Sequence, residues 1–129
     1  MPIPKTYNQS FTWNAANRPS TSVDFLTSGG ALAFSVDMLV DTGADHLAID
    51  ASFASSLGLT VSTMARDPVT LANGTVAHEP YEYVRVAFLG KRLRNVKCYF
   101  SGTGVALLGR VPLLTARETA FDPTGWHCD

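Results

Sequence analysis

The sequence LVDTGAD, residues 39–45, is the stretch that decides the fold expected of this chain. It ends a run, residues 31–40, in which apolar side chains alternate with others, and a period of two over that length predicts a β-strand. The side chains expected on its apolar face are Leu32, Phe34, Val36, Met38 and Val40. The strand delivers the carboxylate of Asp41 into a turn, for which the sequence supplies Thr42, Gly43 and Ala44. Gly43 permits unusual backbone dihedrals and removes bulk beside the carboxylate, so the turn can hold Asp41 rigidly at the floor of a cleft.

Taken alone, the tripeptide Asp41-Thr42-Gly43 has two interpretations. Asp, Thr and Gly are all suited to an ordinary turn at the end of a strand, without any chemistry. The alternative is a carboxylate held for catalysis. The remainder of the chain has to decide between them.

Several more short strands are predicted, with turns between them. They are residues 23–26, 47–49, 69–71, 75–77, 81–88, 93–100 and 105–108. Asp50 is placed to cap a compact helix that ends at Gly58, and Pro112 suits the first turn of a second helix reaching about Arg117. Asn73-Gly74 is a dipeptide favoured in type I′ hairpins. This pattern predicts an all-β fold, a small closed β-barrel or closed sandwich with one or two short helices.

The chain has 129 residues, which suits one domain, residues 23–122, between a polar arm at 1–22 and a tail at 123–129. The 10 Lys and Arg nearly balance the 11 Asp and Glu, which gives no electrostatic reason to expect nucleic acid or an anionic membrane as partner. No signal peptide or membrane-spanning stretch is visible, and the two cysteines are expected to be unpaired thiols in a reducing compartment. We therefore expect a soluble, cytoplasmic protein. The dispersed histidines do not suggest a metal site, and no cofactor is expected.

Three further features follow the Asp-Thr-Gly turn in a fixed order. An acid, Asp45, comes directly after Ala44. A candidate flap hairpin follows, formed by Leu71, Ala72, Asn73, Gly74, Thr75 and Val76. A closing apolar segment, Leu107, Leu108 and Gly109, then leads to Arg110. In this order the motifs resemble the retropepsin family, the homodimeric aspartic proteases of retroviruses and their bacterial relatives, over roughly residues 23–122.

The resemblance implies a closed barrel of the acid-protease type and an aspartic endopeptidase that hydrolyses polypeptide substrates. It implies an ion pair between Asp45 and Arg110, where the alternative is two separate surface charges. It also implies that Thr42 locks the active-site loops of two subunits together. Because the chain carries one Asp-Thr-Gly and is too short for two lobes, a two-fold homodimer with paired Asp41 residues is the expected form.

Two features depart from the family pattern. Val111-Pro112 stands where the family places a polar residue, and neither terminus matches the interleaved strands of viral dimers. The candidate flap is also compatible with a plain surface hairpin. One competing interpretation keeps the fold but makes the chain a catalytically silent binding or dimerisation module. Another is a monomeric β-barrel that binds a ligand and carries the motif by chance.

Overall fold

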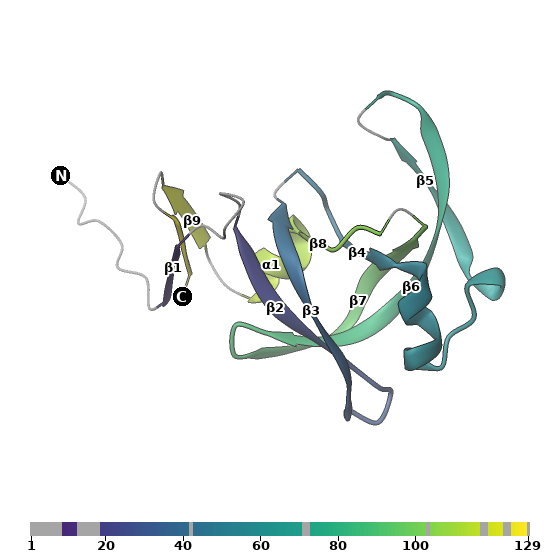
Figure 1. The fold of residues 1–129 in the computed structure, drawn as a ribbon, viewed down its shortest axis with the longest axis horizontal. Coiled ribbons are helices and arrows are strands. Elements are labelled where there is room, and N and C mark those ends of the chain that lie inside the picture. The colour runs from purple at the N-terminus through teal and green to yellow at the C-terminus, as the bar shows by residue number, and fades with distance from the viewer. Residues whose placement is uncertain are drawn as a thin grey trace.

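The computed structural model describes residues 9–12, 19–41, 43–70, 73–102, 104–116, 119–122 and 125–128. Thr42, Leu71, Ala72 and Arg117 lie outside this part of the chain. Within it, Figure 1 shows a twisted barrel with a small sheet to one side.

Six strands close the barrel. They are β2 (Ser20–Leu26), β3 (Leu32–Asp41), β8 (Leu107–Gly109), β4 (Leu47–Asp50), β7 (Lys91–Ser101) and β6 (Val76–Phe88). They are hydrogen-bonded in that order, and an additional pairing of β2 with β6 joins the ends of the sheet. A further strand, β5 (Ala65–Thr70), extends β6 beyond the barrel. The structure thus confirms the predicted all-β closed barrel, with β2 beginning three residues earlier than expected.

The core fills the barrel with side chains that alternate inward along each strand. On β3, Met38 and Val40 are buried, while Phe34 and Val36 pack against the core and Leu32 is 62% exposed at the far end. The largest fully buried side chains of the other elements are Phe25, Phe100, Leu47, Ile49, Leu108 and Leu113. The apolar face predicted for residues 31–40 is therefore correct where the strand runs through the barrel.

Three short helices accompany the strands. The helix predicted after Asp50 is the 3₁₀ helix η1 (Ala51–Leu57). Asp50 caps it by accepting from the backbone N–H of Ser52, and Gly58 ends it with a left-handed φ of 72°. A second 3₁₀ turn is η2 (Val61–Thr63), and α1 (Arg110–Ala116) carries Pro112 in its first turn as predicted.

The prediction of a type I′ turn at Asn73-Gly74 is wrong. The β5–β6 ladder pairs Val69 with Ala77 and Thr70 with Val76, which leaves five connecting residues where a type I′ hairpin needs two. The Asn73 side chain instead accepts from the N–H of Thr75, at 3.0 Å. The two-residue turn lies between β6 and β7, at Leu89 and Gly90, whose φ angles of 50° and 77° are both positive.

The small sheet joins segments from both ends of the chain. Its strands are β1 (Gln9–Thr12), β10 (Gly125–Cys128) and β9 (Thr119–Asp122), in that order and antiparallel. Figure 1 places this sheet beside β2 and α1. In the described part of the chain, no helix has the length and apolar character needed to cross a membrane.

Candidate active site

Asp41 is the last residue of β3, and the strand beside it is β8. The two strands run parallel, with Leu39 opposite Leu107 and Asp41 opposite Gly109. The two sequence motifs, more than sixty residues apart, therefore lie side by side. This pairing brings the closing segment directly to the carboxylate-bearing turn.

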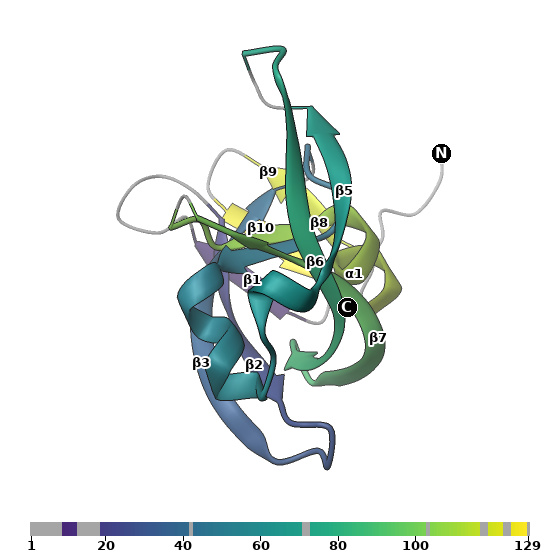
Figure 2. The same ribbon diagram turned by 90° about the vertical axis from the view of Figure 1, so that its right-hand side faces the viewer.

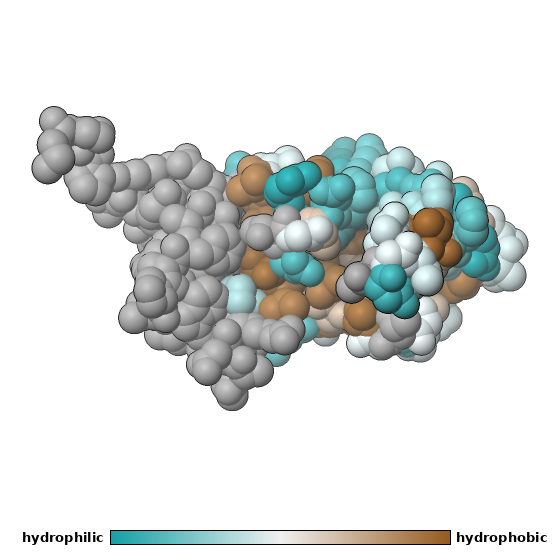
Figure 3. Space-filling model, turned by 90° about the horizontal axis from the view of Figure 1, so that it is seen from above, coloured by the Kyte–Doolittle hydropathy of each residue, from teal (hydrophilic) through white to brown (hydrophobic). Residues whose placement is uncertain are grey.

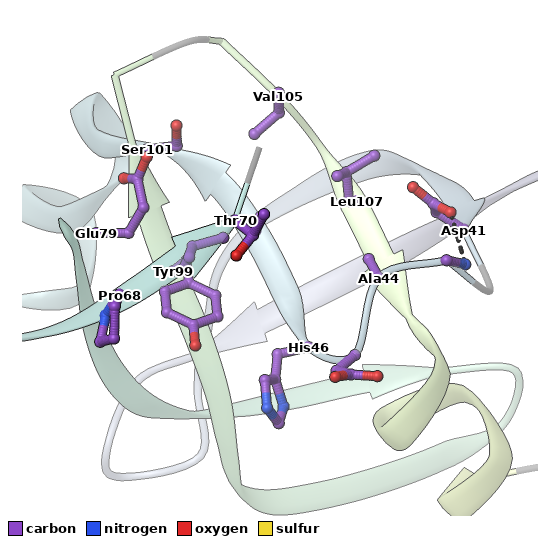
Figure 4. Close-up of a pocket in the computed structure, with 14 residues that line it drawn as sticks. Asp41, Ala44, His46, Pro68, Thr70, Glu79, Tyr99, Ser101, Val105 and Leu107 are labelled. Atoms are coloured by element: carbon purple, nitrogen blue, oxygen red, sulfur yellow. Dashed lines mark hydrogen bonds between the residues drawn. The ribbon is translucent and has the colours of Figure 1, made fainter. Parts of the chain in front are cut away.

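The turn after Asp41 holds the carboxylate through the backbone. The N–H of Gly43 donates to Asp41 Oδ1 at 2.9 Å, shown as the dashed line in Figure 4, and the N–H of Ala44 donates to the Asp41 carbonyl at 3.2 Å. A Cβ on Gly43 would lie 3.1 Å from Asp41 Oδ1, closer than an ordinary van der Waals contact. Gly43 thus leaves the space that its N–H needs to reach the carboxylate, as the sequence predicted.

Gly109 allows the backbone of Asp45 and His46 to cross close against β8. A Cβ at this position would lie 2.3 Å from the carbonyl oxygen of His46 and 2.5 Å from its nitrogen. The crossing is fixed by hydrogen bonds from Arg110 N to Ala44 O, at 2.8 Å, and from Val111 N to Asp45 O, at 2.9 Å. The first N–H groups of α1, which have no partner inside a helix, are satisfied by the loop that follows Asp41.

The two leucines before Gly109 face different ways. Leu108 is fully buried in the core, whereas Leu107 lines the cavity in front of Asp41. Alternation along a strand explains the difference, because consecutive side chains point to opposite faces. The closing segment therefore anchors the barrel with one residue and shapes the site with the other.

The ion pair expected between Asp45 and Arg110 is present. Arg110 Nη2 lies 2.6 Å from Asp45 Oδ1, and the two side chains are 55% and 59% exposed. At such exposure an ion pair contributes only about 0–1 kcal/mol to stability. The pair orients two charges at the rim of the site and does little for the stability of a single subunit.

A cavity of about 720 Å³ opens in front of Asp41. Its walls come from the turn after β3, from β5, and from β6, β7 and the approach to β8. Side chains that line it include Asp41, His46, Val69, Glu79, Tyr99 and Leu107. Seen from above in Figure 3, apolar surface gathers near the middle of the molecule, with mostly polar surface to its right.

The candidate flap is the hairpin of β5 and β6, which rises from the barrel in Figure 2. Its strand β5 contributes Pro68, Val69 and Thr70 to the cavity wall. Nearer the tip, Val76 is 58% exposed, an unusual position for a large apolar side chain. Asn73, Gly74 and Thr75 are also exposed, while Leu71 and Ala72 lie outside the described residues.

A polar cluster that the sequence did not reveal adjoins the cavity through Tyr99, which lines it. Lys97 pairs with Asp67, and the hydroxyl of Tyr99 donates to the same carboxylate at 3.2 Å. The ammonium group also lies 4.3 Å from the centre of the Tyr81 ring, a cation–π contact. The hydrogen bond from Lys97 holds the pKa of Asp67 below its ordinary value.

His46 lies at the edge of this cluster. Its ring centre is 6.0 Å from that of Tyr99. Burial lowers the pKa of His46, and the charge of Lys97 lowers it further, against smaller opposite effects of Asp45 and Asp67. His46 is half-buried and lines the cavity.

The closed all-β barrel and the Asp-Thr-Gly turn beside a parallel Leu-Leu-Gly strand define an aspartic protease fold. A family model described as aspartyl protease matches residues 26–111, well over half of the chain. The chain belongs to the aspartyl protease family. Among solved structures, it is similar to a retropepsin-like aspartic protease from Rickettsia conorii, with a TM-score of 0.74 and 18% sequence identity.

That similarity covers 93% of this chain and 88% of the Rickettsia protein, so the two share the whole fold despite few identical residues. No curated protein sequence is similar enough to count as a match. The fold is thus that of the retropepsin-like aspartic proteases, as the sequence motifs predicted.

Proposed function

We propose that this protein is an aspartic endopeptidase that hydrolyses peptide bonds as a homodimer, with one Asp41 from each subunit. The observation that carries the proposal is the backbone-held carboxylate of Asp41, which lines a large cavity. Each chain supplies only one such turn. The chemistry needs two carboxylates, and a two-fold axis beside Asp41 provides the second.

The two carboxylates share one proton, because like charges about 3 Å apart cannot both ionise. The ionised group takes a proton from water, which attacks the peptide carbonyl. The protonated group polarises that carbonyl and later donates to the leaving nitrogen. The water attack forms the new C–O bond and the C–N bond then breaks, so the reaction consumes one water and releases an acid and an amine.

The test is hydrolysis of a mixed peptide library from acidic to neutral pH by the wild type and by Asp41→Asn. Asn keeps the shape of the side chain but cannot act as general base. Asp37→Asn is a matched control, because Asp37 lies on the same strand and is exposed. Turnover is expected in the wild type and the control, with and without a metal chelator, and is expected to be lost in Asp41→Asn.

Association is measured in parallel by sedimentation at micromolar concentration. The proposal expects a dimer, and a specific activity that falls on dilution as the dimer dissociates. A dimer with no turnover in any variant would favour the silent binding module. A monomer that still cleaves peptides in an Asp41-dependent manner would refute the shared-site mechanism.

A further inference from the structure

One wall of the cavity carries a carboxylate that the proposed reaction does not use. Glu79 lies on β6 and lines the cavity together with Asp41. Figure 4 shows the two side chains at opposite ends of the cavity, so Glu79 is away from the reacting atoms. It is half-buried, which strengthens its interactions relative to a fully solvated charge.

The acids around Glu79 have partners in the protein, whereas no residue that the structure describes pairs with the side chain of Glu79. Asp67 pairs with Lys97 and accepts from Tyr99, and Asp45 pairs with Arg110. The Glu79 side chain has no hydrogen-bond or ion-pair partner among the residues that the structure describes.

The position of Glu79 places it across from another acid. Glu79 stands directly opposite Asp67 in the β5–β6 ladder. Like charges directly opposite on paired strands destabilise a sheet. The nearby ammonium group of Lys97 is already engaged by Asp67 and by the ring of Tyr81.

The rest of the lining adds no positive charge. The described residues around the cavity include the carboxylates of Asp41, Asp45 and Glu79, and neither lysine nor arginine. His46 also lines it, and burial lowers the pKa of His46, which favours its neutral form. A cation in this cavity would therefore meet the Glu79 carboxylate, with no lysine or arginine among the described lining residues.

We infer that Glu79 is a specificity-determining residue that selects substrates with a lysine or arginine side chain at one position near the scissile bond. This assignment rests on the proposed protease function and names the substrate class of that same site. The carboxylate accepts hydrogen bonds from the ammonium or guanidinium group of the substrate. Apolar side chains such as Val69 and Leu107 line the rest of the cavity and accommodate the stem of the long side chain.

The test uses peptides that are cleaved by the wild type, each varied one position at a time to Lys, Gln or Glu. At one position the wild type is expected to favour Lys over Gln by roughly tenfold in kcat/KM, as for a hydrogen bond to a charged group that is partly screened. Glu79→Gln is expected to reduce that preference to within about twofold, and Glu79→Lys to favour Glu, since only local charge has changed.

The control variant is Glu82→Gln, which makes the same charge change on the same strand. Glu82 does not line this cavity, and its side-chain oxygen accepts from the N–H of Tyr83, a contact that Gln can keep. It is expected to retain the tenfold preference for Lys. Loss of the preference in both variants would reduce the effect to net charge and overturn the assignment.

A binding measurement separates this inference from the proposed activity. The Asp41→Asn protein, with and without Glu79→Gln, is titrated with Lys and Gln peptides drawn from the mixed library, whether or not the wild type cleaves them. Asp41-dependent cleavage with a Lys preference that Glu79→Gln leaves unchanged would overturn the role of Glu79 alone. Absent cleavage, with tighter binding of Lys peptides that Glu79→Gln abolishes, would refute the protease function and uphold the role of Glu79. Absence of any Lys preference in both cleavage and binding would overturn it.

Discussion

Replacing Gly109 by alanine should destabilise the protein more than any other glycine substitution outside a turn. The added Cβ would meet three backbone atoms, at 2.3 and 2.5 Å in His46 and 2.7 Å in Asp45. These separations are roughly 1 Å shorter than favourable contacts between heavy atoms. Because the neighbours are backbone atoms and not the end of a flexible side chain, the strand and the crossing segment must move apart.

The size of the effect follows from what that movement disturbs. Overpacking a tight interior costs about 1–3 kcal/mol. The movement also stretches the two hydrogen bonds from Arg110 N and Val111 N to the crossing segment, each worth about 0.5–1.5 kcal/mol. The expected loss is about 4 kcal/mol, within a range of roughly 2–6. With an m-value of about 1.5 kcal/mol/M, this lowers the urea midpoint by roughly 2.5 M.

Substitutions at two other glycines serve as controls. They separate the steric clash at Gly109 from the general effect of replacing glycine by alanine. Gly58 has a φ of 72° and nothing within 4 Å of the added Cβ, so Gly58→Ala should show only backbone strain, about 1–2 kcal/mol. Gly102 is also in open space, without a left-handed φ, and Gly102→Ala should change stability by less than about 0.5 kcal/mol. The free energy of unfolding of each variant is measured by urea denaturation at the same protein concentration. A Gly109→Ala loss no greater than that of Gly58→Ala would refute the close backbone crossing.

Two further changes probe the edges of the site. Arg110→Gln should cost at most about 1 kcal/mol in urea unfolding of the monomer, because the pair with Asp45 is more than half exposed, and a loss above about 3 kcal/mol would contradict that exposure. His46 should make the protein less stable in mild acid. Burial lowers its folded pKa, so below about pH 6.5 the unfolded chain takes up a proton that the folded state binds more weakly. The urea midpoint should therefore decrease from pH 7.5 to pH 5.5, and the decrease should be larger in the wild type than in His46→Gln. Equal decreases in the two proteins would exclude this effect of His46 on stability.

Local sequence patterns were sufficient where the backbone decides the structure. The alternation over residues 31–40 predicts β3, and the Asp50 and Gly58 caps bound η1. The order of the Asp-Thr-Gly and Leu-Leu-Gly motifs, through the family resemblance, also anticipated that Asp45 and Arg110 meet. Each of these depends on residues close in sequence or on a motif of fixed composition.

The turn preferences of single dipeptides gave the wrong prediction where the register of the paired strands decides the turn. Asn-Gly favours a type I′ turn, but the pairing of Val69 with Ala77 fixes an odd-numbered connection that cannot contain one. The turn with two positive φ angles occurs at Leu89-Gly90, although Leu is poorly suited to a φ of 50°. There the Phe88–Lys91 pair of the β6–β7 ladder leaves only two residues to connect the strands.

The same limit hid the polar cluster beside the cavity. Glu79, which lines the cavity, alternates with Tyr81 and Tyr83 along β6, and that spacing is visible in the sequence. Their chemistry depends on which residues lie opposite them, namely Asp67 across from Glu79 and Tyr99 across from Tyr81. A shift of one residue in either ladder would turn every one of these side chains to the other face. The sequence alone does not specify that register.

The site therefore has two parts with different physical origins. Backbone groups hold Asp41 in place, through the N–H of Gly43 and the pairing with Gly109. Side chains from other strands, Glu79 and Tyr99 among them, shape the cavity in front of it. Substitution of a lining side chain leaves the backbone hydrogen bonds to Asp41 intact. Changes at Glu79 should therefore alter the preference between Lys and Gln peptides without removing the hydrogen bond from Gly43 to Asp41.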